Sequence, residues 1–282
     1  MVAVFGISSA LLVVPATAQQ TSYASRPITI IVPLAPGSVP DSQARLYMPR
    51  LSERLGVPVV VDNRPGASGN IGIELAAKAP GDGYTRLMVG GSFSISPAIN
   101  KRVPYDPIRS FQPIVLNSIG YFVLAVSSNT RASSLAEFIA DAKSRPGELN
   151  YASPGNGSVQ HLTMELFNLN AGVNLTHVPY KGVDGAMRDL AGGIVNAMFV
   201  VSENVLPLAK SGRVRVLAAL GPSRNFLFPD VPLMSEAGLH NIQVRAWSGL
   251  LAPASTPRDI VQKLNVEMNA VLRLPEIQDA VI

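Results

Sequence analysis

The chain has 282 residues, of which 47% are hydrophobic and 15% are charged. This composition excludes a disordered chain, and the length allows two ordinary domains or one large one. The net charge of +4 comes from Lys and Arg residues that are scattered singly, so no basic stripe favours nucleic-acid binding. Because the sequence contains no cysteine, it excludes disulfides, thiolate metal sites and cysteine nucleophiles.

The N-terminus has the pattern of a secretory signal. Val2–Val14 is an apolar run too short for a membrane span, and residues 16–18 (Ala-Thr-Ala) supply the small-x-small pattern that precedes cleavage. We therefore predict a signal peptide over residues 1–18, against the alternative of a buried N-terminal strand or helix. No Lys or Arg follows Met1, which indicates an incomplete start of the signal.

From Ile28 onward, short strand-like runs alternate with helical patterns, which is typical of an α/β fold with parallel sheets. Ten strands exceed what one compact sheet of this kind usually holds, so we expect two sheets. Ser134 and Glu137 have capping-box spacing for a helix through about Lys143. The expected strands are Ile28–Val32, Val57–Asp62, Arg86–Val89, Phe111–Leu116, Phe122–Val126, Leu149–Ala152, Leu175–Val178, Ala197–Val201, Val214–Ala219 and Val244–Leu251.

The first candidate site segment follows the first strand and opens a helix that extends to about Leu55. A loop in this position presents backbone N–H groups and the positive end of a helix dipole, which suits an anion. The candidate residues are Gly37, Ser38, Val39 and Asp41. The alternative is a Pro-rich turn without a ligand, in which Asp41 caps the helix.

Two further loops have similar chemistry. Gly91, Ser92 and Phe93 follow the Arg86–Val89 strand, where glycine permits close backbone approach and the hydroxyl group can donate to a carboxylate. A second nest of amides and hydroxyls precedes another helix, at Ser153, Gly155, Asn156, Gly157 and Ser158. If both loops lie at the carboxyl ends of strands in facing sheets, an anion can bind between them.

Five more residues complete the candidate set. His161 lies in the first turn of the helix after Ser158, where it either faces the ligand or has a capping or packing role. Tyr180 and Lys181 follow another strand, and Ser202 and Glu203 follow a third. Lys181 has solvent exposure as its alternative, so Tyr180 is the better pocket candidate.

Nothing in the sequence favours catalysis. There is no G-x-S-x-G elbow, no nucleotide-binding glycine motif and no histidine pair with metal-ligand spacing. We therefore expect no enzymatic activity, no cofactor and no metal site.

Several segments together resemble the Bug-type extracytoplasmic receptors of tripartite tricarboxylate transporters. The similarity runs from Arg26 nearly to Ile282. The matching segments are RPITIIVP (26–33), VVVDNRPGASGNIG (59–72), DGYT (82–85), LNYAS (149–153), HVPYKG (177–182) and FPDVP (228–232).

The resemblance implies a type II periplasmic-binding-protein fold, in which two α/β domains joined by crossover strands close on a ligand. We expect one domain at residues 24–120 with 246–282 and the other at 121–245. The family binds carboxylates through backbone amides, hydroxyls and waters, and usually has a Gly-Gly pair where this chain has Gly37 and Ser38.

The same resemblance implies a monomer in the periplasm of a Gram-negative bacterium, which delivers a small carboxylate to integral-membrane permease subunits. The family usually continues several tens of residues beyond the position of Ile282, so we also expect that a longer version would be more stable. Two alternatives are the effector-sensing domain of a transcription regulator with this fold, and a hydrolase or isomerase.

Overall fold

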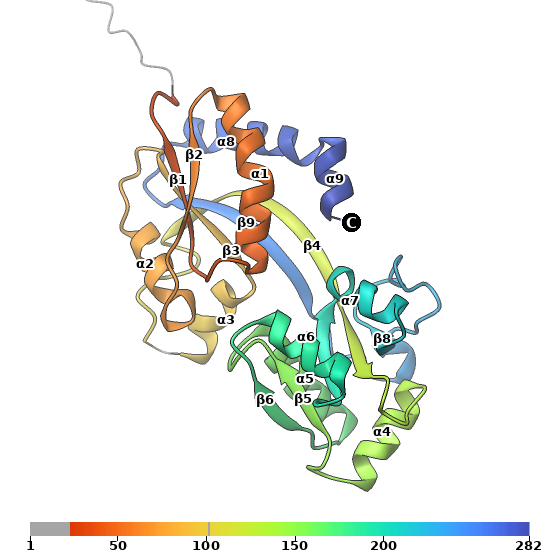
Figure 1. Cartoon of the computed structure of the whole chain (residues 1–282). Coiled ribbons are helices and arrows are strands. Elements are labelled where there is room, and N and C mark those ends of the chain that lie inside the picture. The colour runs from red at the N-terminus through yellow and green to blue at the C-terminus, as the bar shows by residue number, and fades with distance from the viewer. Residues whose placement is uncertain (1–22, 101, 282) are drawn as a thin grey trace, which may run out of the picture.

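The computed structural model describes residues 23–100 and 102–281, and the predicted signal peptide lies outside them. These residues form two lobes, joined by the long strands β4 (Phe111–Ser127) and β9 (Arg245–Pro253) (Figure 1). Both lobes have helices on the two faces of a sheet, which confirms the predicted α/β class. Within the described residues, no helix is both long enough and apolar enough to cross a membrane.

The first lobe has a mixed sheet in the order β2-β1-β3-β9-β4. Its strands β1, β2 and β3 are parallel, and β9 is antiparallel to both β3 and β4. Besides β4 and β9, the elements of this lobe are β1 (Ile28–Val32), α1 (Val39–Leu55), β2 (Val59–Asn63), η1 (Ala67–Gly69), α2 (Asn70–Ala77), β3 (Thr85–Gly90), α3 (Ser92–Ile99), α8 (Arg258–Leu272) and α9 (Pro275–Val281).

Side chains that alternate along the strands divide the core of the first lobe into two layers. Ile28, Ile30 and Val32 of β1 pack in one cluster with residues of α1 and α8. Ile31 points to the opposite face and packs in a second cluster with residues of α2 and α3. The Val- and Ile-rich run of β1 is therefore buried on both sides, as expected for a parallel strand between helices.

The second lobe has the strand order β6-β5-β7-β4, with β8 paired to the other edge of β4. Phe122, Leu124 and Val126 of β4 pack with residues of α4 and α5, while Val123 and Ala125 pack with residues of α6 and α7. The elements of this lobe are α4 (Leu135–Ser144), β5 (Asn150–Ser153), α5 (Val159–Ala171), β6 (Thr176–Pro179), α6 (Val183–Gly192), β7 (Ala197–Val201), α7 (Ser202–Lys210), β8 (Val214–Ala219) and η2 (Met234–Ala237).

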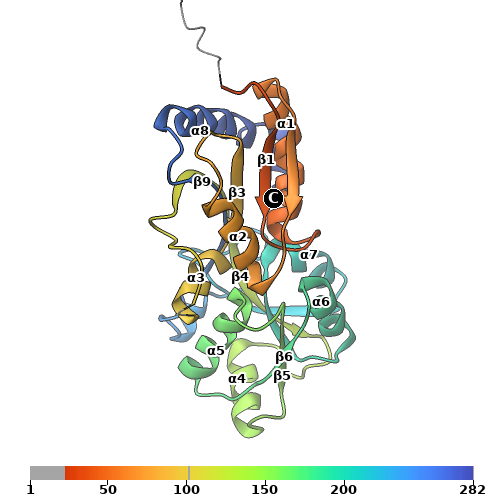
Figure 2. The ribbon, with the colours of Figure 1, turned by 90° about the vertical axis from the view of Figure 1, so that its left-hand side faces the viewer.

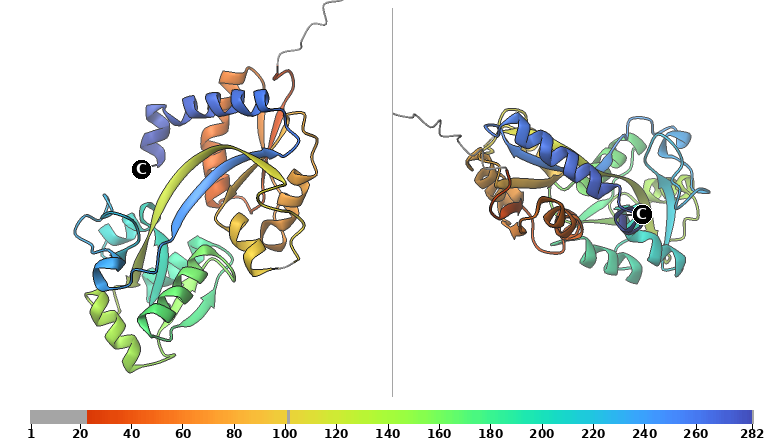
Figure 3. Two further views of the ribbon diagram at one scale, coloured as in Figure 1. Left: turned by 180° about the vertical axis from the view of Figure 1, so that it is seen from behind. Right: turned by 90° about the horizontal axis from the view of Figure 1, so that it is seen from above.

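The two connecting strands run side by side from one lobe to the other (Figure 3). The prediction of separate strands at Phe111–Leu116 and Phe122–Val126 is wrong, because β4 is continuous through both. Residues between them stay extended because they pair with β9 as far as Tyr121, which is opposite Arg245. From Phe122 onward β4 pairs with strands of the second lobe. The assignment of residues 24–120 with 246–282 and of residues 121–245 to two domains remains our proposal.

Candidate functional site

Two loops from different lobes meet where the lobes approach each other. Gly91 lies between β3 and α3, and a Cβ atom added to it would be 2.6 Å from Cγ2 of Val159, the first residue of α5. A Cβ atom added to Gly157 would likewise be 2.9 Å from Cδ1 of Ile99 in α3. Figure 2 shows α3 above α5, at the boundary between the lobes. The strand-end loops that the sequence singled out therefore face each other.

A pocket of about 260 Å³ lies at this boundary. Three of the predicted residues, Ser92, Asn156 and Gly157, contribute to its walls. The pocket is lined by Ala67, Asn70, Ser92, Ser96, Ile99 and Asn100 from the first lobe and by Asn156 and Gly157 from the second. All of these residues are uncharged, so a guest would meet hydroxyl, amide and backbone groups together with the apolar side chain of Ile99.

Asp41 shapes the first loop through its buried carboxylate. The carboxylate accepts hydrogen bonds from the Gly37 amide at 2.9 Å, from Asn63 Nδ2 at 2.9 Å and from Arg45 Nε at 3.1 Å. Burial alone would raise the pKa of the Asp41 carboxyl, but these hydrogen bonds outweigh it and hold the pKa below its ordinary value. The Asp41 carboxylate is thus used in hydrogen bonds within its own lobe.

The rest of the first loop stays close to the interlobe boundary but outside the pocket lining. Gly37 and Val39 are exposed, and Ser38 precedes α1 without a side-chain capping bond. Pro40 Cγ lies 3.7 Å from the position that a Cβ atom on Gly90 would take, so the loop adjoins the end of β3.

Phe93 belongs to the core of the first lobe. Its ring stacks on Tyr105 at a centroid distance of 5.5 Å and meets the edge of Phe111 at 5.5 Å. The Tyr105 hydroxyl donates to the Phe93 carbonyl oxygen at 3.0 Å. The ring of Phe93 is thus used in the core, and Phe93 is not among the residues that line the pocket, so its role as a candidate ligand-binding residue falls to its backbone.

Internal hydrogen bonds hold the loop of the second lobe. Ser153 is fully buried, and its hydroxyl lies 2.7 Å from His177 Nε2 and accepts from the Gly155 amide at 3.1 Å. Ser158 caps α5 by accepting from the His161 amide at 3.2 Å. The intervening Asn156 is exposed and lines the pocket.

His161 is hydrogen-bonded to this loop through its side chain. Its Nδ1 accepts a hydrogen bond from the Gly157 amide at 3.1 Å, and its ring stacks on His177 at 4.1 Å. His177 in turn stacks on Tyr151 at 4.8 Å, and the Tyr151 hydroxyl donates to Glu165. The His161 side chain is therefore used in packing and in holding Gly157, which was the alternative to a role in ligand contact.

The remaining predicted residues lie outside the pocket lining. The Tyr180 hydroxyl donates to Asp189 at 2.6 Å; burial, and next this hydrogen bond, raise the pKa of Tyr180 to about 12. Lys181 is exposed, in agreement with its solvated alternative. Ser202 is buried and donates to Glu203 at 3.0 Å.

The residues that sequence reasoning missed are in η1, at the start of α2, and in or just after α3. Asn70 and Ala67 belong to the segment RPGASGNIG, which the family resemblance included but which follows an edge strand and has no ligand-binding pattern of its own. Ser96 lies about one turn into α3, and Asn100 directly follows the last residue of α3. The spacing of these residues in the sequence gives no functional signal.

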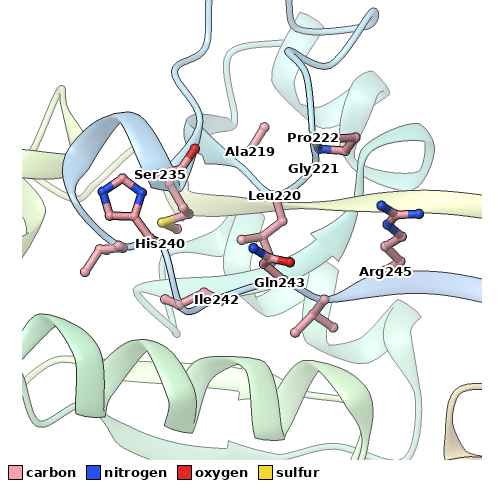
Figure 4. Close-up of a pocket in the computed structure, with 12 residues that line it drawn as sticks. Ala219, Leu220, Gly221, Pro222, Ser235, His240, Ile242, Gln243 and Arg245 are labelled. Atoms are coloured by element: carbon pink, nitrogen blue, oxygen red, sulfur yellow. The ribbon is translucent and has the colours of Figure 1, made fainter.

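A second pocket, of about 240 Å³, belongs to the second lobe alone (Figure 4). Ser235, His240, Gln243 and Arg245 are its residues with polar side chains, and Leu220 and Met234 are among its apolar residues. It lies between the end of β8, η2 and the start of β9, so the facing loops contribute nothing to it.

The half-buried His177 predicts a pH dependence of stability. Burial, followed by the neighbouring His161, lowers the pKa of His177, while Glu165 acts in the opposite direction. As pH falls below about 6.5, the unfolded chain takes up a proton at this residue before the folded chain does, so the free energy of unfolding should decrease. Urea unfolding at pH 7.5 and 5.5 measures the difference.

A His177→Gln variant should show a smaller difference between the two pH values than the wild type. His240→Gln, at an exposed position of the same lobe, is the matched control and should leave the difference unchanged. Equal differences in His177→Gln and the wild type would contradict the assignment to His177.

The two lobes, the crossover strands and the pocket between facing loops define a solute-binding protein of the type II periplasmic class. The family model described as "Tripartite tricarboxylate transporter family receptor" matches residues 43–282. The chain therefore belongs to this receptor family, as the resemblance predicted.

Relatives of known sequence and structure agree with this assignment. Protein BugT of Bordetella pertussis (strain Tohama I) is 36% identical over 282 residues, which cover 99% of this chain and 86% of BugT. The structure of periplasmic binding protein BugD superimposes with a TM-score of 0.81 at 33% identity, covering 91% of this chain and 86% of BugD.

Two similar structures contain carboxylate ligands. Rpa4515 of Rhodopseudomonas palustris, solved with adipate, has a TM-score of 0.83 and 35% identity, and the match covers 92% of this chain and 87% of that one. MatC (Rpa3494) from the same species, with bound malate, has a TM-score of 0.82 and 32% identity over 91% and 87% of the two chains.

Proposed function

We propose that this protein is a periplasmic receptor that captures a small organic carboxylate between its lobes and delivers it to integral-membrane permease subunits. The observation that carries the proposal is the pocket formed jointly by Ser92 of the first lobe and by Asn156 and Gly157 of the second. A guest that contacts both walls favours the arrangement in which the lobes meet, because it binds that arrangement more tightly than a separated one.

The pocket chemistry supports a carboxylate guest. Helices α3 and α5 both begin at the facing loops, so the positive ends of their dipoles lie near the pocket, and the hydroxyl and amide side chains of the lining add neutral donors. Neutral donors of this kind can hold an anion without an Arg or Lys. Adipate and malate, found in the two similar structures, are short dicarboxylates, so acids of similar length are the ones to test.

The proposal extends to activity, assembly and location. We propose that the protein has no enzymatic activity, works as a monomer, and resides in the periplasm of a Gram-negative bacterium. Support comes from its membership of a receptor family and from its similarity to a periplasmic binding protein.

A set of three or more His, Cys, Asp or Glu residues suited to a metal ion is absent from residues 23–100 and 102–281.

A ligand screen tests the function directly. Adipate, malate and related acids are titrated against the protein while the melting temperature and the fluorescence of Trp247, the single tryptophan, are recorded. Trp247 Nε1 lies 3.9 Å from the Cβ position at Gly91, so its emission should respond to events in the cleft. At least one acid should bind saturably and raise the melting temperature, and the uncharged diamide of the same acid should not. Consumption of the acid would instead favour an enzyme.

A further inference from the structure

The donor that α2 presents to the pocket comes from a rigidly held residue. Asn70 is the first residue of α2, and the residue is only 8% exposed although it lines the pocket. The preceding Gly69 has φ of 95°, and a Cβ atom there would be 3.2 Å from the Pro33 carbonyl oxygen. A Cβ atom on Gly72 would be 2.6 Å from the Arg64 carbonyl oxygen. The two glycines thus let the start of α2 pack closely against the end of β1 and the segment after β2.

Ser96 holds the side-chain amide of Asn70 by a hydrogen bond to the amide oxygen. The Ser96 hydroxyl of α3 donates to Asn70 Oδ1 at 3.1 Å, and Ser96 itself is 6% exposed. With Oδ1 engaged by this bond, the Nδ2 group is the end of the amide left for the pocket. Among the described residues, no group accepts a hydrogen bond from Asn70 Nδ2. This nitrogen is also not among the fully buried polar atoms that lack a hydrogen-bond partner. The pocket therefore receives N–H donors from this side chain and no acceptor.

Resting on the proposed function, we propose that Asn70 determines specificity in the cleft by donating from Nδ2 to a carboxylate oxygen of the guest, and that Ser96 is its positioning residue. Asn156 and Gly157 line the opposite wall of the pocket from the second lobe. A guest must therefore present an oxygen acceptor toward α2. A dicarboxylate meets this requirement at either end, whereas an ammonium group, which only donates, cannot accept a bond from Nδ2.

The experiment compares Asn70→Asp with the wild type, using adipate and malate as probes in isothermal titration calorimetry. The substitution keeps the shape of the side chain but replaces the donor with a carboxylate, which should weaken binding of the better acid at least about tenfold. Asn129→Asp adds the same charge at an exposed position far along the second lobe and should leave the affinity unchanged. Melting temperatures without ligand establish that both variants are folded.

Ser96→Ala separates positioning from general packing. Without the Ser96 bond the amide can flip and present Oδ1, so the preference for adipate over its monoamide should fall at least about threefold. A merely structural role for Ser96 would lower the melting temperature and leave this preference unchanged. Unaltered adipate binding by folded Asn70→Asp would overturn the inference while leaving the receptor function intact. A wild-type protein that binds no acid would overturn both.

Discussion

A Gly91→Ala variant is expected to bind its carboxylate about five to 150 times more weakly than the wild type, without a loss of stability. The added methyl group would lie 2.6 Å from Cγ2 of Val159 across the cleft, and overpacking of this kind costs about 1 to 3 kcal/mol. Because φ at Gly91 is −54°, alanine fits the backbone, and the cost falls only on the arrangement in which the lobes meet. Isothermal titration calorimetry and thermal unfolding measure the two effects.

Shortening the opposing side chain provides the control. In the double variant Gly91→Ala with Val159→Ala, the methyl group has room, and affinity should return to within about threefold of the wild type. Val159→Ala alone should bind nearly as the wild type does. If the double variant binds as weakly as Gly91→Ala, the contact between these two positions does not limit closure.

An Asp41→Ala variant is expected to lose about 2 to 4 kcal/mol of stability and to bind ligand more weakly. Removal of the buried carboxylate leaves the Gly37 amide without its acceptor and leaves Asn63 Nδ2 with only the Leu34 carbonyl oxygen, at 3.1 Å. The ion pair with Arg45 contributes little, because the Arg45 side chain is 54% exposed. Urea unfolding measures the stability, and ligand titration shows whether the loop before α1 keeps its shape.

Asp41→Asn distinguishes the charge from the hydrogen bonds. One amide oxygen still accepts, so this variant should lose less stability than Asp41→Ala. Arg45→Gln, which removes only the exposed partner, should change stability by less than about 1 kcal/mol. A large loss in Arg45→Gln with a small loss in Asp41→Ala would contradict this account.

The sequence predicted the elements of the fold well because their signals are local. The strands Ile28–Val32, Ala197–Val201 and Val214–Ala219 have the predicted bounds. The capping prediction at Ser134 is confirmed, since its hydroxyl accepts from the Glu137 amide at 3.2 Å. Periodicity and end signals depend on neighbouring residues, so a single sequence contains them.

The directions of side chains were harder to predict. Phe93 and Tyr180 follow strands in candidate loops, yet Phe93 packs with Tyr105 in the core and Tyr180 bonds to Asp189. Conversely, Asn70 reaches the pocket from a helix that had no ligand-binding pattern. A residue's place in a loop leaves its rotamer and its neighbours open, because these depend on segments distant in the chain.

The sequence by itself determined the α/β class, the position of the loops at the ends of strands and the family, since each signal is contained in contiguous stretches of residues. Only the tertiary structure decided that β4 is continuous between the lobes and that Gly91 meets Val159. It also decided that Asn70, held by Ser96, completes the wall of the pocket. These contacts join residues far apart in the chain, and they form only when two separately packed cores bring their loops together.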